Sequence, residues 1–174
     1  MRAKTVKGIP SFDDLYASAP GEIKDYITKC GKTPQGTDWH PEGNVGIHVR
    51  LVYDRAAEYG DINLAVAAFF HDLGKVDTTA KNKRGGWSAI GHERVSANLV
   101  DRNSDWISEL GANPAEVHEL VFQHMRIKQF DDMKGSKKQI LRDNPLFGKL
   151  NQFTKCDDMT TLTPEELKRY ESMK

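Results

Sequence analysis

Six histidines and a few aspartates are the residues of this 174-residue chain whose types and spacing could do chemistry. His71 is followed at once by Asp72, at the end of a segment, 62–70, that is apolar nearly all round. A helix that is apolar on every side belongs in the centre of a domain, where an unpaired charge is costly. A metal ion would neutralise the carboxylate and fix the imidazole together, so the doublet predicts a buried metal site.

Helical periodicity shows which other candidates face the same interior. Three histidines and one aspartate fall on apolar stripes: His48 within 45–59, His92 within 88–101, His124 within 114–130 and Asp157 within 145–159. By the same geometry His118 is displaced from its stripe, and Asp158 points about 100° away from Asp157. Because Asp158 directly follows Asp157, the identity of the inward aspartate is ambiguous by one residue, and the stripe favours Asp157. A single inward histidine is usually a hydrogen-bonded core residue, but several helices that each offer a ligand are harder to explain by packing.

The elements that must position these residues are helices, because no segment shows the apolar–polar alternation of a half-buried strand. Helices are predicted at 11–18, 21–29, 45–59, 62–73, 88–101, 104–110, 114–130, 136–143, 145–159 and 163–173, with loops at 31–44 and 75–87. The length suits one domain. We therefore predict an all-α fold, a single compact helical bundle over residues 1–174.

Composition excludes several classes of function. The chain has 25 basic and 25 acidic residues, so bulk electrostatic capture of extended duplex DNA is not expected. It has no run of about 18 apolar residues and no apolar signal-peptide stretch after Met1, so we expect neither a membrane span nor secretion. The only cysteines, Cys30 and Cys156, are expected to be reduced thiols in a cytoplasmic protein. The oligomeric state is left open.

The ordered set His48, His71-Asp72 and Asp157 resembles the H…HD…D pattern of the HD-domain metal-dependent phosphohydrolases. The segment 40–48 (HPEGNVGIH) is similar to the start of the HD domain appended to CCA-adding tRNA nucleotidyltransferases. The segment 71–75 (HDLGK) matches the central family motif, and 91–93 (GHE) resembles its next landmark. The resemblance covers about residues 39–160. Nothing here resembles the nucleotidyltransferase head, so we expect a free-standing HD domain.

The resemblance implies a set of metal ligands. His48, His71, Asp72 and Asp157 would hold a first ion, with Asp72 a candidate bridge, and His92 and His124 would serve a second. Mixed imidazole and carboxylate ligands suit Mn²⁺, Fe²⁺, Co²⁺, Ni²⁺ or Zn²⁺ better than Mg²⁺. Asp72 and Lys75 are the candidate catalytic residues, since Lys75 could neutralise charge that grows on phosphate oxygens. The alternative for Lys75 is a solvated lysine after a helix end.

Substrate contacts are expected beside the metals. The basic, glycine-containing loop 81–87 supplies Arg84 for phosphate and Trp87 for stacking on a base, or it is a surface loop that Trp87 anchors. Arg126, two residues past His124, could bind a phosphate. The resemblance implies a metal-activated water that hydrolyses phosphate mono- or diesters of nucleotides or RNA ends, including 2′,3′-cyclic phosphates. Hydrolysis of nucleoside triphosphates or cyclic (oligo)nucleotides, and a non-catalytic metal-stabilised nucleotide sensor, remain alternatives. A di-iron oxygenase of related architecture is a more distant one.

Overall fold

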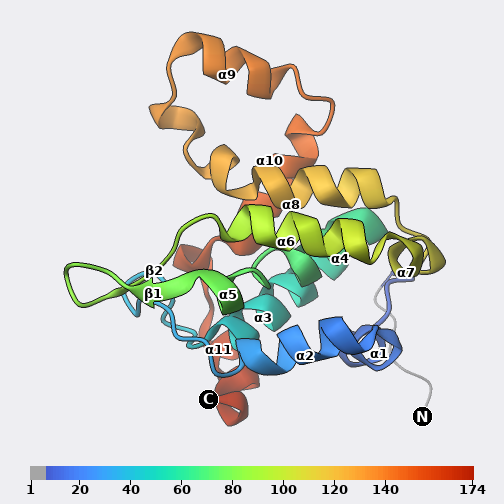
Figure 1. The fold of residues 1–174 in the computed structure, drawn as a ribbon, viewed down its shortest axis with the longest axis vertical. Helices are drawn as coiled ribbons and strands as arrows, with labels where there is room; N and C mark the ends of the chain where they lie inside the picture. Colours follow the sequence, from blue (N-terminus) through green and yellow to red (C-terminus); the bar gives the residue numbers. More distant parts are fainter. Residues whose placement is uncertain (1–6) are drawn as a thin grey trace.

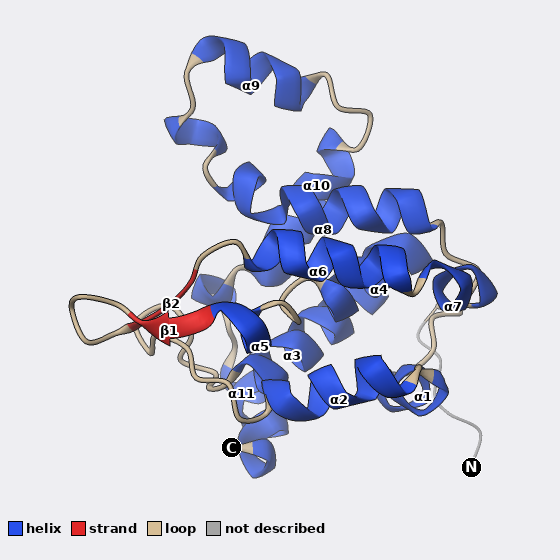
Figure 2. Cartoon of the chain, in the orientation of Figure 1, coloured by secondary structure: helices blue, strands red, loops and turns tan. Residues whose placement is uncertain are grey.

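The computed structural model describes residues 7–174, and helices are the main elements of this part of the chain (Figures 1 and 2). The α-helices are α1 (Phe12–Ser18), α2 (Gly21–Cys30), α3 (Val45–Ala57), α4 (Ile62–Phe70), α5 (Lys75–Thr78), α6 (His92–Arg102), α7 (Ser104–Glu109), α8 (Pro114–Lys128), α9 (Gly135–Arg142), α10 (Phe147–Asp157) and α11 (Pro164–Tyr170). Short 3₁₀ turns lie at Phe130–Asp132, Met159–Thr161 and Glu171–Met173. The predicted all-α class is confirmed.

Helix α4 is the centre of the bundle, packed against α3, α6, α8 and α10. Every side chain from Leu64 to Phe70 is fully buried, as its uninterrupted apolar sequence predicts. Asp61 caps the helix by accepting hydrogen bonds from the backbone N–H groups of Asn63 and Leu64. The helix ends at Phe70, three residues earlier than predicted, and residues 71–74 form turns. The His71-Asp72 doublet therefore lies directly after the end of the helix, in the middle of the core.

The predicted loop 75–87 is more ordered than its sequence suggested. It contains α5 and leads into an antiparallel hairpin of β1 (Thr79–Lys81) and β2 (Trp87–Ala89), with Lys81 opposite Trp87 (Figure 2). Strands of three residues are too short to produce a readable alternation, which explains why none was predicted. The next helix begins at His92 rather than near 88, because the chain is still in the hairpin and Gly91 adopts a left-handed φ of 80°.

Beyond α8 the chain leaves the bundle, runs through α9, and returns along α10 (Figure 1). Phe130 and Phe147 lie 5.3 Å apart between ring centroids and close the base of this excursion. At the other end α11 packs on α3, where Arg55 makes two 2.8 Å hydrogen bonds to Glu166. None of the helices in 7–174 combines the length and the apolar character that crossing a bilayer requires.

Candidate metal centre

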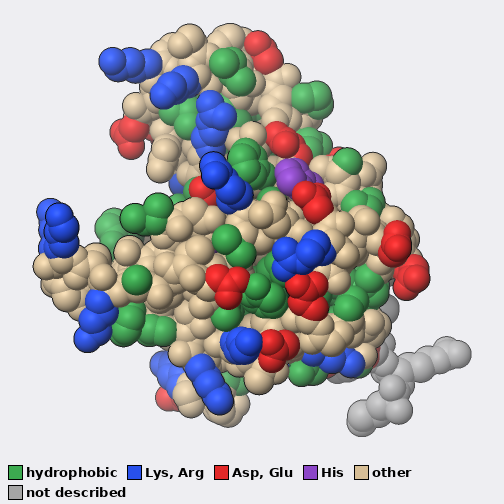
Figure 3. Space-filling view, viewed as in Figure 1, with side chains coloured by type: hydrophobic (Ala, Val, Ile, Leu, Met, Phe, Trp, Pro, Cys, Tyr) green, Lys and Arg blue, Asp and Glu red, His purple; other side chains and the backbone are tan. Residues whose placement is uncertain are grey.

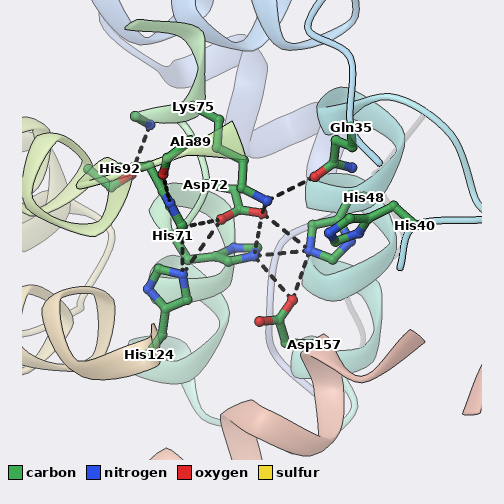
Figure 4. A network of polar contacts seen from close by, with 12 residues as sticks. Gln35, His40, His48, His71, Asp72, Lys75, Ala89, His92, His124 and Asp157 are labelled. Atoms are coloured by element: carbon green, nitrogen blue, oxygen red, sulfur yellow. Dashed lines mark hydrogen bonds and ion pairs between the residues drawn. The ribbon is translucent and has the colours of Figure 1, made fainter. Parts of the chain in front are cut away.

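Six polar side chains from different parts of the chain point toward one another in the core (Figure 4). Each is at most 5% exposed. They are His48 on α3, His71 and Asp72 after α4, His92 at the start of α6, His124 on α8 and Asp157 at the end of α10. These are the six residues that the sequence suggested as ligands, and the structure brings all of them together. His118, which lies off its stripe, instead pairs with Asp101 at the surface.

Asp72 lies between two groups of histidines. Its Oδ2 is 3.3 Å from Nε2 of His48 and 3.3 Å from Nε2 of His71. Its Oδ1 faces the other way, 3.1 Å from Nε2 of His92 and 3.6 Å from Nε2 of His124. One carboxylate therefore offers one oxygen to each of two possible cation positions.

Asp157 completes the group around His48 and His71. Its Oδ1 lies 2.8 Å from Nε2 of His48 and 3.5 Å from Nε2 of His71. The neighbouring Asp158 turns away, and its Oδ1 accepts hydrogen bonds from the backbone N–H and the hydroxyl of Thr160. The helical stripe thus placed the correct one of the two aspartates inside the cluster.

The four histidines are all held by the same ring nitrogen, Nδ1. Three of them contact a backbone carbonyl three residues earlier: His71 that of Ala68 at 2.7 Å, His92 that of Ala89 at 2.7 Å, and His124 that of Val121 at 2.6 Å. His48 contacts Glu42 Oε1 at 2.7 Å. A carbonyl or carboxylate oxygen only accepts, so Nδ1 carries a proton in each ring, and Nε2 of the neutral ring keeps its lone pair.

These lone pairs face one another at short range. The Nε2 atoms of His48 and His71 are 3.3 Å apart, and those of His92 and His124 are 3.2 Å apart. Acceptors at such distances need a proton or a cation between them. Ligand atoms about 2.1 Å from one metal ion lie about 3.0–3.4 Å apart in octahedral or tetrahedral geometry. The spacing, the buried position and the fixed tautomers of this donor set all fit a bound divalent metal.

Titration within the cluster points the same way. Burial alone would lower the pKa of His71, but the adjacent carboxylates of Asp72 and Asp157 outweigh it and raise this pKa to about 9. Burial would raise the pKa of each carboxyl, yet His71 and the nearby lysines hold both well below their usual range. The two carboxylates thus stay ionised and draw a positive charge into the core, as a cation site does.

Close packing of backbone fixes the distance between the doublet and α6. A Cβ on Gly74 would lie 2.2 Å from the carbonyl oxygen of His92. The Gly74 N–H also donates a 2.8 Å hydrogen bond to Ser96 Oγ. Any larger residue at position 74 would push His92 away from Asp72, so the glycine of the family motif has a structural reason here.

Two lysines contact the carboxylates. Lys75 Nζ lies 2.8 Å from Asp72 Oδ2 and 2.9 Å from Gln35 Oε1. Lys128 forms an ion pair with Asp157 Oδ2. The sequence pointed to Lys75 but missed Lys128. The available signal was spacing: residues four apart share a helix face, and Lys128 lies four positions after His124.

A pocket of about 470 Å³ opens beside the cluster. Its lining includes His92, Lys75, Lys128 and His40, together with Trp39, Trp87 and Ile90. Trp39 is 80% exposed and Ile90 88%. A wall of apolar side chains beside fixed cations can hold a ligand that has both an apolar and an anionic part.

Two predicted substrate contacts do not line this pocket. Arg84 lies in the exposed turn of the hairpin. Arg126 is two residues from His124 on α8, so its side chain leaves the helix about 200° away from that of His124. The cation from the end of α8 that lines the pocket is Lys128, whereas the sequence suggested Arg126 as the phosphate-binding residue of this segment.

Comparison with known proteins agrees with this geometry. The HD domain family matches residues 45–146. A multifunctional CCA protein from Cupriavidus necator is 44% identical over half of this chain, and those from Burkholderia vietnamiensis and Burkholderia pseudomallei are 33% and 46% identical over 49% of it. The chain corresponds to only 24% of the length of each of these relatives. With more than half of its residues matched and the motif residues gathered in one cluster, the chain belongs to the HD-domain family.

Proposed function

We propose that this chain is a metal-dependent phosphohydrolase that acts on phosphate esters of nucleotides or RNA ends, 2′,3′-cyclic phosphates among them. One observation carries the proposal: the two oxygens of Asp72 face two separate histidine pairs at 3.1–3.6 Å. In the assignment that follows, His48, His71, Asp72 and Asp157 hold a first ion, and Asp72, His92 and His124 hold a second. The mixed nitrogen and oxygen donors favour Mn²⁺, Fe²⁺, Co²⁺, Ni²⁺ or Zn²⁺ over Mg²⁺.

The bound ions would supply Lewis acidity, which polarises a phosphoryl group and makes a water molecule nucleophilic near neutral pH. The protein side chains supply the rest. Asp72 keeps the two ligand groups in register, because one of its oxygens faces each group. Lys75 and Lys128 line the pocket and present positive charge to phosphate oxygens, where negative charge grows during the reaction.

The pocket favours a substrate with a base next to its phosphate. Trp39 and Trp87 offer aromatic faces on which a nucleobase can stack. Lysine and arginine side chains also mark the projecting hairpin and the α9 excursion (Figure 3), so an anionic substrate longer than a mononucleotide would meet further cations. The matching relatives are named as CCA proteins, which supports RNA ends as the first substrates to test.

A panel of phosphate esters tests the proposal. Purified protein would be assayed with 2′,3′-cyclic nucleotides, nucleoside mono- and triphosphates, cyclic dinucleotides and RNA with phosphorylated ends, each with Mn²⁺, Co²⁺, Ni²⁺, Zn²⁺ or Mg²⁺. We expect metal-dependent hydrolysis of the cyclic phosphates or RNA ends, and a loss of several orders of magnitude in Asp72→Ala without loss of helical content. Equal rates in the wild type and Asp72→Ala would expose a contaminant. Bound metal without turnover on any substrate would instead favour the non-catalytic sensor.

A further inference from the structure

Glu42 is a buried glutamate in the loop between α2 and α3. Only 1% of its surface is exposed, although the segment around it has no regular secondary structure. Glutamate is almost never fully buried unless it is paired. Here the partners are two histidines: Glu42 Oε1 lies 2.7 Å from Nδ1 of His48 and 2.9 Å from Nδ1 of His40.

The two histidines belong to different parts of the site. His48 directs its Nε2 into the ligand cluster, 2.8 Å from Asp157 Oδ1. His40 lines the pocket, with a fifth of its side chain exposed. Their rings meet edge to face with centroids 4.9 Å apart. One carboxylate oxygen is therefore hydrogen-bonded both to a ligand of the metal centre and to a residue that lines the pocket.

The acceptor on Nδ1 of His48 is a carboxylate oxygen, 2.7 Å away. A charged acceptor on Nδ1 strengthens the Nε2 of the same ring as a ligand and prevents the ring from flipping. The other three histidines of the cluster have neutral carbonyl acceptors instead. His48 is thus the histidine most dependent on its partner.

A third ion held by His40, Glu42 and His48 is the competing explanation, since their ligand atoms lie within 4.8 Å of one another. That ion would have to replace the proton on Nδ1 of His48 and convert the ring to an imidazolate. The 2.7 Å contact to Glu42 is what an N–H donor makes with a carboxylate, so the proton explains the geometry without this cost.

We propose that Glu42 is the positioning residue of the metal centre. Its carboxylate fixes the tautomer and orientation of His48, and the same oxygen holds His40 in the wall of the pocket. The metal centre and the substrate pocket therefore share one anchor. This inference rests on the proposed function, because it assigns Glu42 a role toward the metal.

Metal titration of four variants tests the inference independently of any hydrolysis. Metal-free wild type, Glu42→Gln, Glu42→Ala and His40→Ala would be titrated with Co²⁺ against a competing chelator, with Co²⁺ absorption followed in the visible range. Glu58→Gln is the control, an exposed carboxylate just after the C-terminal end of the helix that carries His48. Outer ligand partners typically contribute 10–100-fold to metal affinity. We expect losses of about tenfold in Glu42→Gln and about a hundredfold in Glu42→Ala.

The loss should be confined to one binding step. In the Glu42 variants, the affinity of the metal-binding step assigned to His48 should fall, while the affinity of the step assigned to His92 and His124 stays within about twofold of the wild type. In His40→Ala and Glu58→Gln, the affinities of both steps should stay within about twofold. A far-downfield proton signal from the Nδ1–H of His48 should be present in the metal-free wild type and absent from Glu42→Ala. If Glu42→Ala does not fold, Glu42→Gln keeps the volume and an acceptor.

Several outcomes would overturn the inference. Unchanged affinity in both Glu42 variants would do so, as would equal weakening of both steps together with a lower melting temperature of the metal-free protein. Loss of one bound ion in His40→Ala as well as in Glu42→Gln would show a third metal site instead. If the wild type binds metal and the Glu42 variants bind it with the same affinity, only this inference is refuted. A wild type that binds no metal would refute the proposed function too.

Discussion

Separate substitutions of the two adjacent aspartates at the end of α10 distinguish a role in metal binding from a role in folding. Asp157 Oδ1 lies 2.8 Å from Nε2 of His48, whereas Asp158 caps the following turn through Thr160. Asp157→Asn should therefore lower the affinity for the metal, and Asp158→Ala should lower the stability of the fold. The amide in Asp157→Asn retains a hydrogen-bonding group, and Lys128, whose side chain is about one third exposed, keeps access to water. Loss of the ionised partner still removes the stability that the lowered pKa of Asp157 represents, so the metal-induced change in melting temperature, rather than the metal-free stability, reports the loss of the ligand.

The size of the two effects can be worked out. Outer partners of ligands contribute up to about a hundredfold, so loss of a direct carboxylate ligand should cost at least that, or about 2.7 kcal/mol. With metal at about 1000 times the wild-type Kd, bound metal stabilises the wild type by about 4 kcal/mol and the Asp157→Asn variant by about 1.4 kcal/mol. For a chain of this size the difference corresponds to about 5–10 °C in metal-induced melting temperature. Loss of a cap in Asp158→Ala should cost about 1 kcal/mol, or about 2–4 °C, with or without metal.

Differential scanning fluorimetry of both variants and the wild type, with and without Mn²⁺ or Co²⁺, measures both quantities in one experiment. A chelator competition assay gives the affinities directly. The reasoning would be refuted if Asp158→Ala lost the metal-induced stabilisation while Asp157→Asn kept it. It would also be refuted if metal stabilised the wild type no more than Asp157→Asn.

Two further predictions concern the second ion and the acid stability of the fold. His92→Ala and His124→Ala should each reduce the metal content from two ions to one per chain and lower turnover more than melting temperature; elemental analysis that finds one ion in the wild type and in both variants would make them core histidines. The hydrogen bonds from Arg55 lower the pKa of Glu166 from 4.5 to about 2, so the stability they contribute is present above pH 4.5 and is lost as pH falls toward 2. Denaturant unfolding should show that the free energy of unfolding of the wild type falls by up to about 3 kcal/mol from this source between pH 5 and pH 2. The fall should be smaller in Glu166→Gln. In the exposed control Glu165→Gln it should equal that of the wild type.

The inward set of ligands was predictable because helices carry a strict period. Once a segment is helical, residues at spacings of three and four share a face, and the face that holds leucines and valines must turn to the core. This rule separates Asp157 from Asp158 and His124 from His118 without any structure. Applied equally to α8 it would also have selected Lys128 over Arg126, since only Lys128 returns to the face of His124. The prediction of Arg126 came from counting proximity in sequence rather than rotation around the helix.

Glu42 and the hairpin lay beyond this kind of reasoning. Glu42 is in a loop with no period, so its burial depends on where α3 and its neighbours bring His40 and His48. The hairpin strands are three residues long, and their pairing depends on the turn between Asn82 and Gly86 rather than on a hydrophobic pattern. Both features arise from contacts between segments, and the sequence of each segment alone carries little sign of them.

The charges around the site show why its metal-binding and substrate-binding parts depend on each other. Three buried carboxylates, Asp72, Asp157 and Glu42, lie within one cluster, and two lysines contact two of them. Lys75 and Lys128 each touch a carboxylate that we assign to a metal ion, and each also lines the pocket that we assign to the phosphate. A positive charge that arrives at these carboxylates weakens their hold on the lysines. A negative charge that arrives in the pocket attracts the same lysines from the other side. If both ligands bind as proposed, their affinities would be coupled through these two side chains, and by linkage each ligand would strengthen the binding of the other.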